Sequence, residues 1–327
     1  MPANESVSEP QKPSSSEILI PLSDVSLASM TSWRIGGNAK QLVRPTSSEQ
    51  LIHYFQNNVI PKHQVWLGLG SNVLIPDEGV HGLVVCTRAM QQCTILPNGW
   101  VYADAGLTCA KFSRFCSRNG FPDGAFFAGI PGTIGGALAM NAGAFGGETW
   151  EWVQKTKVLM QAGNMIERNA AEYTVGYRSV SLRSNYLNGV PEAAGHFNQE
   201  AFLGAYFKFP KKLSEDGLLK IKELLRKRAD TQPIGTLNCG SVYRNPEGDF
   251  AAKLIEGCQL KGFTIGDALV STKHANFIIN QGSGTAKDIQ LIMSEIEDKV
   301  YARYQVRLEP EVRIIEANYP QSKGDKK

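Results

Sequence analysis

After Thr285, apolar residues recur every three or four positions, the spacing that places side chains on one face of an α-helix. The pattern predicts a long core-packing helix whose apolar stripe comprises Ile289, Ile292, Met293, Ile296 and Val300. From residue 305 to 316 the period changes to two, which predicts a final strand. Its apolar face would hold Val306, Leu308, Val312 and Ile314. The opposite face carries Glu311 and Arg313 as neighbours, and pattern alone favours a solvated face there.

Residues 18–210 alternate predicted strands with a few helices. Thr46 and Glu49 form a potential capping box before one helix, and Thr108 can cap another. The predicted strands cover residues 39–44, 64–67, 83–86, 101–105, 153–160, 175–182 and 202–209.

The composition changes after Pro210. Residues 214–229 predict a Lys/Arg-rich amphipathic helix, with Leu218, Ile221 and Leu225 facing inward. A short helix at residues 250–257 and a strand at residues 275–280 are expected to follow.

A glycine-rich stretch, residues 129–147, carries no charged side chain. Glycine inside an element costs backbone entropy, so such density indicates positive φ or close approach of the main chain to another group. The intervening apolar residues require burial, which argues against a flexible linker. The stretch predicts a buried main-chain surface against a large, flat or anionic cofactor. Close packing between helices or strands is the alternative.

Residues 68–75 (GLGSNVLI) follow a predicted strand but do not complete a dinucleotide fingerprint. Val73 occupies the position of the third glycine, and the residues after the turn favour a strand where the fingerprint needs a helix. The turn could present N–H groups to a pyrophosphate, or it could be an ordinary hairpin turn.

Bulk composition narrows the function classes. A net charge of +3 without a basic stripe argues against nucleic acid as a partner. The six cysteines show no metal-ligand spacing, which predicts reduced, mostly buried thiols in a cytoplasmic protein without a metal site. No apolar run reaches the ~20 residues of a membrane helix, so no membrane association is expected. Residues 1–17 predict a disordered tail, and residues 319–327 predict a second polar tail.

Six motifs in one order resemble the UDP-N-acetylenolpyruvoylglucosamine reductase (MurB) family. The resemblance runs from Thr31 to Glu316, and residues 272–276 look like the type II branch. The motifs are residues 31–37 (TSWRIGG), 68–74 (GLGSNVL), 130–144 (IPGTIGG with NAGA), 176–178 (GYR), 239–246 (CGSVYRNP) and 308–313 (LEPEVR).

The resemblance implies an α+β fold: a two-part FAD-binding cradle of the p-cresol methylhydroxylase/vanillyl-alcohol oxidase type, plus a smaller α/β substrate domain. The expected divisions are a first FAD-binding subdomain at residues 18–86, joined by a final strand at 305–318, a second at 87–210, and a substrate domain at 211–304. A monomer is expected.

The resemblance also implies the reaction. NADPH reduces the flavin, and the enolpyruvyl ether of UDP-N-acetylglucosamine then takes a hydride and a proton. The family's proton donor falls on Ser241, with Arg244 or Lys253 as neighbours that could assist it. Arg178 would hold the substrate carboxylate, and Glu311, with its pKa raised by burial, would hydrogen-bond the same group. Arg313, on the same strand face as Glu311, would tune that carboxyl group and contact the substrate.

Binding residues are carried over in the same way. The expected pyrophosphate contacts of FAD are Gly68, Gly70, Ser71 and Asn72. The expected flavin contacts are Ile130, Pro131, Gly135 and Gly136, with Tyr177 beside the flavin or the nicotinamide. Asn245 and Gln259 would contact the UDP group. Residues 229–233 (ADTQP) lack a basic residue common in the family, and Arg228 or Lys273 could replace it.

Two other interpretations stay open. One is an FAD oxidase or dehydrogenase of the same superfamily acting on an alcohol or hydroxy acid, although no paired Tyr/Arg/His set is evident. The other is a non-catalytic nucleotide-sugar- or flavin-binding paralogue. The presence of Arg178, Ser241 and Glu311 together argues against such a paralogue.

Overall fold

The computed structural model describes residues 18–183, 200–212 and 217–318. The two predicted tails, residues 1–17 and 319–327, lie outside the described residues, as do residues 214–216 of the predicted basic helix. Within the described ranges, no helix combines the length and apolar character needed to cross a membrane. All six cysteines lie in these ranges and are free thiols, four of them buried, as predicted.

A four-stranded sheet forms the first part of the fold, in the order β1-β2-β5-β3. Strands β2, β5 and β3 run parallel, and β1 is an antiparallel edge strand. Helix α1 begins one residue later than the capping box predicts. The N-cap residue is Ser47 and not Thr46, because the Ser47 side chain accepts a hydrogen bond from Gln50 N. The bounds are β1 (Leu22–Ser26), β2 (Asn38–Val43), α1 (Ser48–Asn57), β3 (Gln64–Leu67) and β5 (Val80–Cys86).

A five-stranded antiparallel sheet forms the second part, in the order β11-β10-β14-β7-β6. Helices α2 and α3 and the 3-10 helix η3 pack with it around an aromatic-rich core. Thr108 caps α2, as predicted. The bounds are β6 (Cys93–Ile95), β7 (Val101–Asp104), α2 (Cys109–Arg118), η3 (Pro122–Gly129), α3 (Ile134–Met140), β10 (Val153–Met160), β11 (Met165–Asn169) and β14 (Glu200–Phe207).

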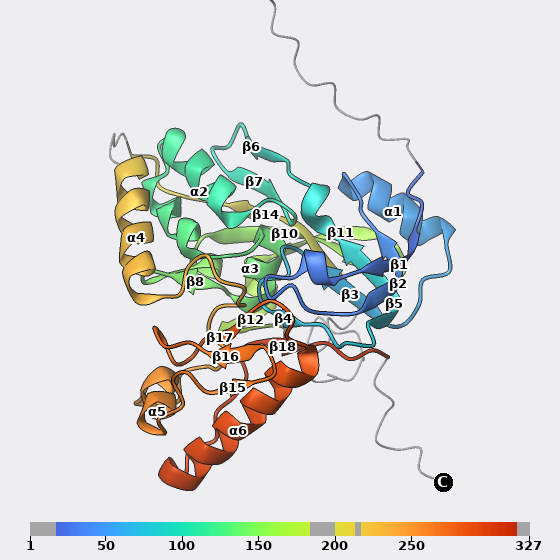
Figure 1. Cartoon of the computed structure of the whole chain (residues 1–327). Coiled ribbons are helices and arrows are strands. Elements are labelled where there is room, and N and C mark those ends of the chain that lie inside the picture. Colours follow the sequence, from blue (N-terminus) through green and yellow to red (C-terminus); the bar gives the residue numbers. More distant parts are fainter. Residues whose placement is uncertain (1–17, 184–199, 213–216, 319–327) are drawn as a thin grey trace, which may run out of the picture.

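The third part is a small sheet, β15-β16-β17, packed with α5 and α6. Figure 1 shows these elements together at one end of the molecule, with the two larger sheets at the other. Thr285 caps α6, and the predicted stripe of this helix is buried throughout. The bounds are α5 (Ala251–Gly257), β15 (Thr264–Ile265), β16 (Ala268–Val270), β17 (Ile278–Asn280) and α6 (Ala286–Tyr304).

The expected final strand, residues 305–316, is mostly absent. Only β18 (Arg313–Ile314) is a strand, and it pairs in parallel with β4 (Val73–Leu74). Pro310 lacks an N–H, and the preceding residues instead bond to the third part, where Arg244 N donates to Glu309 O over 2.9 Å. Ile314, predicted to be buried, is 45% exposed. The segment thus crosses from the third part to the first, and Figure 1 shows β4 and β18 at that junction.

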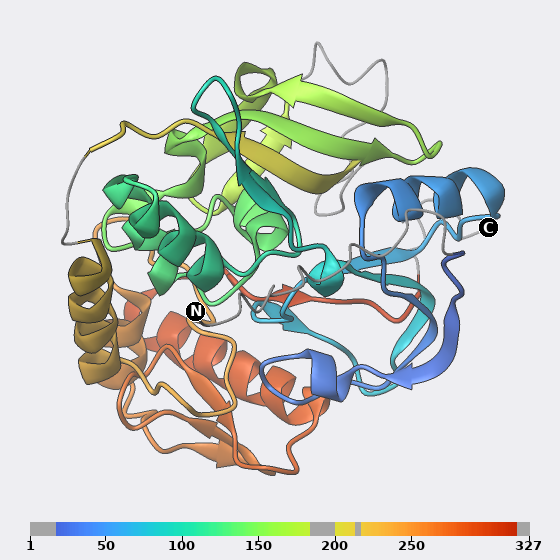
Figure 2. The same ribbon diagram turned by 90° about the horizontal axis from the view of Figure 1, so that it is seen from above.

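Helix α4 (Gly217–Thr231) lies apart from the sheet that follows it in sequence. It packs against η3 and α2 in the second part, and Figures 1 and 2 show it beside those helices. Of its three predicted inward residues only Ile221 is buried, whereas Leu218 and Leu225 are exposed. The domain boundary predicted at residue 210 therefore separates α4 from the elements that it contacts.

Trp33 and Asp77 connect the first part to the third. The indole of Trp33, fully buried, donates to Ile278 O over 2.8 Å, and Asn280 Nδ2 donates back to Trp33 O over 2.8 Å. The Asp77 carboxylate accepts from the first two N–H groups of α6, at 2.8 and 3.1 Å. A carboxylate at a helix N-terminus is stabilising, so these contacts fix the third part against the first.

Candidate active site

A cavity of about 610 Å³ lies where the three parts meet. Its walls come from the turn after β3, from residues 129–145, from the C-terminal end of α4, and from residues 239–241 and 311–313. A volume of this size is typical of pockets for cofactors and small substrates. Arg178, Ser241, Glu311 and Arg313 all line it, so the structure brings these four predicted site residues together.

The turn that follows β3 forms one wall of the cavity. It leads into strand β4, so the prediction of strand–turn–strand in place of a fingerprint helix is confirmed. Gly68, Gly70, Ser71 and Asn72 all line the cavity. A Cβ on Gly70 would lie 2.2 Å from Met30 O, and one on Gly68 would lie 2.3 Å from Thr133 Oγ1. Neighbouring protein atoms therefore exclude a side chain at both glycines.

The glycine-rich stretch serves two purposes. A Cβ on Gly135 would lie 2.9 Å from the Cβ of Ala105, so this glycine allows close packing. The prediction that Gly135 contacts the flavin is wrong, because Gly135 does not line the cavity. Gly132 and Gly136 do line it, and a Cβ on either would meet no protein atom closer than 3.4 Å. These two glycines leave space that a side chain would fill. With the apolar wall of Ile130 and Pro131, that space suits a flat ring system.

Arg178 occupies the tip of a hairpin made by β12 (Tyr173–Gly176) and β13 (Ser179–Leu182). Its φ of 53° is left-handed, a conformation that costs a residue with a side chain on the order of 1–3 kcal/mol. Its Nε donates to Glu311 Oε1 over 2.6 Å, and Arg244 Nη2 donates to its carbonyl over 3.3 Å. Strain of this kind persists where surrounding contacts over-determine the conformation.

The backbone of Glu311 is held on both sides. Its N–H donates to Val242 O over 2.7 Å, and its carbonyl accepts from Asn72 Nδ2 over 3.0 Å. Because Val242 follows Ser241, and Asn72 belongs to the turn after β3, Glu311 joins two walls of the cavity. Its side chain is 15% exposed and forms an ion pair with Arg178. The pattern-based interpretation of a solvated face is therefore wrong at this position.

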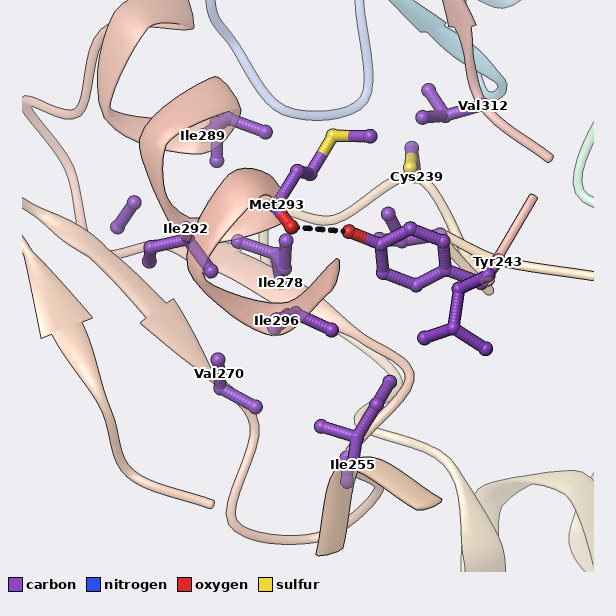
Figure 3. Packing of buried hydrophobic residues seen from close by; sticks show 14 of the residues in the cluster. Cys239, Tyr243, Ile255, Val270, Ile278, Ile289, Ile292, Met293, Ile296 and Val312 are labelled. Carbon is purple, nitrogen blue, oxygen red and sulfur yellow. Dashed lines mark hydrogen bonds between the residues drawn. The ribbon is translucent and has the colours of Figure 1, made fainter. Parts of the chain in front are cut away.

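Buried hydrogen bonds to Asn276 and to α6 hold the loop that carries Ser241. Asn276, 3% exposed, accepts from Tyr243 N over 2.9 Å and donates to Tyr243 O over 2.8 Å. The Tyr243 hydroxyl donates to Met293 O in α6 over 2.8 Å, with Cys239 and Val312 nearby (Figure 3). Burial raises the pKa of the Cys239 thiol well above its usual value, so this cavity-lining thiol stays protonated.

Five residues that the sequence predicted at or near the site do not line the cavity. Tyr177 is 50% exposed beside the Arg178 guanidinium, which lies 5.2 Å from its ring centre, and it does not line the cavity. Asn245 and Gln259 are exposed and also outside the lining; the Asn245 side chain accepts from Ala251 N at the start of α5. Lys253 pairs with Asp249 on the surface. Lys273 donates to Ala229 O and lies outside the lining too.

The C-terminal end of α4 forms a wall of the cavity that was not predicted from the sequence. Lys227, Arg228, Thr231 and Gln232 line the cavity, and of these four only Arg228 was predicted as a possible ligand contact. Arg228 Nη1 donates to Gly129 O over 2.6 Å, and its Nε donates to Gln232 Oε1 over 2.7 Å. Burial lowers the pKa of Arg228, and that of Arg313 as well. Lys227 and Arg228 place two cations at this end, which makes the cavity suitable for an anionic ligand.

Comparison with known proteins assigns both halves of the chain. Residues 39–169 match a model of an FAD binding domain, and residues 232–315 match the C-terminal domain of UDP-N-acetylenolpyruvoylglucosamine reductase. The Methylococcus capsulatus reductase of that name is 45% identical over 290 residues, which is 88% of this chain and 91% of that protein. The Coxiella burnetii reductase is 40% identical over 312 residues, 89% and 94% of the two chains.

The fold agrees with these sequence relationships. A crystal structure of UDP-N-acetylenolpyruvylglucosamine reductase (MurB) from Thermus caldophilus matches with a TM-score of 0.74 and 27% identity. The match covers 91% of this chain and 99% of that one. The chain therefore belongs to the UDP-N-acetylenolpyruvoylglucosamine reductase family, with the two-part FAD-binding cradle and smaller third domain that its sequence predicts.

Proposed function

We propose that the protein reduces UDP-N-acetylglucosamine enolpyruvate to UDP-N-acetylmuramate, with FAD as cofactor and NADPH as reductant. The observation that carries the proposal is the convergence of Arg178, Ser241 and Glu311 on one cavity whose glycine wall is open to a flat ring. Bound FAD would supply the hydride that adds to the methylene carbon of the enolpyruvyl group. Family membership supports both the cofactor and the substrate.

Gly132 and Gly136 would admit the flavin, together with Ile130 and Pro131. The turn of Gly68, Gly70, Ser71 and Asn72 would hold the pyrophosphate through its main chain. Backbone N–H groups in such turns make anion-binding concavities without charged side chains. This arrangement leaves the cations of the cavity for the substrate.

Arg178 would receive the substrate carboxylate. Glu311 would have to carry a proton to hydrogen-bond the same group, because two carboxylates repel each other. Hydride addition leaves negative charge on the carbon next to that carboxylate, so a guanidinium here stabilises the enolate as it forms. Arg178 uses only Nε for Glu311 and makes a longer 3.4 Å contact from Nη1 to Asn141 O. The edge formed by Nη1 and Nη2 would thus be suited to a planar, two-oxygen contact. Arg313, two residues after Glu311, lines the same cavity and adds positive charge there.

Ser241 would deliver the proton to the same carbon. A serine hydroxyl is a weak acid, so neighbouring positive charge must stabilise the oxygen that remains. Arg178 and Arg313 line the same cavity, whereas Lys253 lies on the surface beside Asp249. The structure therefore favours the two arginines over Lys253 in this supporting role. Arg244 would act indirectly, through its bond to the Arg178 carbonyl.

The diphosphate of the substrate would lie toward α4, where Arg228 and Lys227 supply positive charge. Contacts from Asn245 and Gln259 to the UDP group stay a prediction; they require the substrate to extend past the cavity onto the exposed surface. Tyr177 would meet a ligand only at the cavity mouth. A cytoplasmic location also stays a prediction, supported by the six free thiols. A monomeric state stays a prediction as well.

A steady-state assay separates this function from its alternatives. Without oxygen, purified protein should oxidise NADPH beyond the one equivalent that reduces its flavin only when the enolpyruvyl sugar nucleotide is present, and mass spectrometry should find the lactyl ether product. Consumption that needs oxygen but not the sugar nucleotide would favour another flavin oxidase or dehydrogenase of this fold. Sugar-nucleotide binding without turnover would favour a non-catalytic paralogue.

A further inference from the structure

The tip of the Arg178 hairpin needs an anchor of its own. The base of the hairpin is held in the core of the second part by Tyr173, with Val180 and Leu182 packed against that core. The hairpin is a two-stranded sheet, however, and such a ribbon alone is marginally stable in water. Most of its residues outside Tyr173 are exposed or half-buried. The left-handed Arg178 lies at its tip, between Gly176 and Ser179. A displacement of the tip would move the guanidinium directly.

Asn141 provides such an anchor. It ends helix α3 in the left-handed conformation, with φ 41° and ψ 51°, and is 1% exposed. Its Nδ2 donates over 3.2 Å to Gly176 O, just before the hairpin tip. Its own carbonyl accepts from Arg178 Nη1 over 3.4 Å. Side chain and main chain of one residue therefore hold both the turn and the guanidinium.

The amide of Asn141 is itself fixed in orientation. Nδ2 also donates to Glu148 Oε2 over 2.8 Å, and Oδ1 accepts from Trp150 N over 3.1 Å. Both donor hydrogens and the oxygen are thus used, which assigns the amide orientation without ambiguity. Met140 and Ala142 on either side line the cavity, whereas Asn141 does not. Its role is therefore structural support for Arg178 and not ligand contact.

We propose that Asn141 is a positioning residue that holds Arg178 in register with Glu311 through its bond to Gly176. The kinetic part of this inference rests on the proposed function. The structural part does not, because the hairpin can be examined without any substrate. Misplacement of a substrate-binding group by about 1 Å can slow a reaction by ~10²-fold.

The double substitution Asn141→Asp with Glu148→Gln tests the bond to Gly176 selectively. The introduced aspartate keeps an acceptor for Trp150 N, and the introduced glutamine supplies a donor to the second carboxylate oxygen. The Gly176 carbonyl alone then loses its donor and faces a carboxylate. Glu148→Gln alone is the control, since Asn141 Nδ2 can still donate to the glutamine oxygen and to Gly176 O. Glu148 also accepts from the Glu151 N–H in a capping box, so the single glutamine oxygen of this control must serve both donors. The single Asn141→Asp variant should be the least stable, because two carboxylates then face each other.

Three readouts are expected from the holoenzyme. Amide hydrogen exchange in residues 173–182 should quicken in the double variant and stay at the wild-type rate in Glu148→Gln. The single-turnover rate of substrate reduction should fall by ~10²-fold in the double variant, with flavin reduction by NADPH unchanged. The added loss should vanish in an Arg178→Ala background, because residues that act through one another are not additive.

Wild-type exchange in the hairpin, or a wild-type substrate rate with faster exchange, would overturn the inference. Equal additive loss in the Arg178→Ala background would also overturn it and indicate general destabilisation. If the double variant fails to fold, Asn141→Gly replaces it, since glycine keeps the left-handed backbone and removes the side chain. If the protein shows no reductase activity, the exchange experiment still tests the anchor, so the two failures are distinguishable.

Discussion

Arg178 Nε lies 2.6 Å from Glu311 Oε1, although 133 residues separate the two in sequence. The hairpin tip delivers one side chain, and the segment bridging Val242 and Asn72 delivers the other. Before substrate binds, each group thus supplies a partner of opposite charge to the other. Under the proposed function, a substrate carboxylate would find the Arg178 guanidinium already oriented by Glu311, which would reduce the entropic cost of ordering that side chain on binding.

Arg178→Lys should lower the single-turnover rate of substrate reduction by ~10²-fold or more. A lysine ammonium cannot reproduce the planar fork that serves Glu311, Asn141 O and the substrate together. Stopped-flow measurement of flavin reoxidation by substrate checks this. Arg183→Lys is the matched control: Arg183 directly follows β13, donates to Tyr173 O over 3.3 Å and does not line the cavity. Similar losses in both variants would contradict the role of Arg178.

Two adjacent glycines in α3 should respond oppositely to alanine. Gly136→Ala adds a methyl group to the cavity and removes a helix glycine, so FAD should bind more weakly while flavin-free protein gains ~0.5–1 kcal/mol of unfolding free energy. Gly135→Ala places a Cβ 2.9 Å from the Ala105 Cβ, so the protein should lose ~1–3 kcal/mol. Urea unfolding and FAD fluorescence titration measure the two effects. A reversed order would disprove the assignment of the cavity wall.

Protonation of His274 should lower the free energy of unfolding as the pH falls below 6.5. Burial lowers its pKa below the usual 6.5, with Lys261 adding to the effect and Glu256 opposing it. The folded state therefore binds its proton less readily than the unfolded state, so its contribution is complete above pH 6.5 and lost as pH falls through the folded pKa. His274 Nδ1 also accepts from Asn276 N over 3.3 Å, and protonation removes that acceptor.

His274→Asn isolates this effect, because an asparagine oxygen can accept from the same N–H as an Asx turn does. Urea unfolding at about pH 7 and about pH 5 should show a loss in wild type that is reduced in the variant. Equal losses in the two proteins would assign the acid sensitivity to other groups.

Local patterns were predictable from the sequence. The stripe of α6, the bounds of β10 and the Thr108 cap all depend on residues within a few positions of one another, and all are as predicted. Arg178, Ser241 and Glu311 could be named only because whole motifs resemble a family. Their spacing in the sequence does not predict that the three residues share one cavity, because long-range contacts bring them together.

Predictions failed where tertiary contacts decide. The pattern of α4 identifies an amphipathic helix but not how much of its apolar face a neighbour covers, so Leu218 and Leu225 were placed wrongly. The sequence does not distinguish the adjacent glycines Gly135 and Gly136, yet Gly135 packs against Ala105 and Gly136 lines the cavity. Asn141 stood inside a recognised motif, but its bond to Gly176 follows only from the folded hairpin.

Ser241 should serve the reduction of the substrate alone and not the reduction of the flavin by NADPH. Anaerobic stopped-flow absorbance tests this most directly, with NADPH added first and the enolpyruvyl sugar nucleotide second. In wild type the flavin band should bleach and then return. In Ser241→Ala the bleaching should keep its rate, whereas the return should slow by ~10²–10⁴-fold, the usual contribution of a general acid. Equal slowing of both steps, or a band that only oxygen restores in wild type, would contradict this assignment.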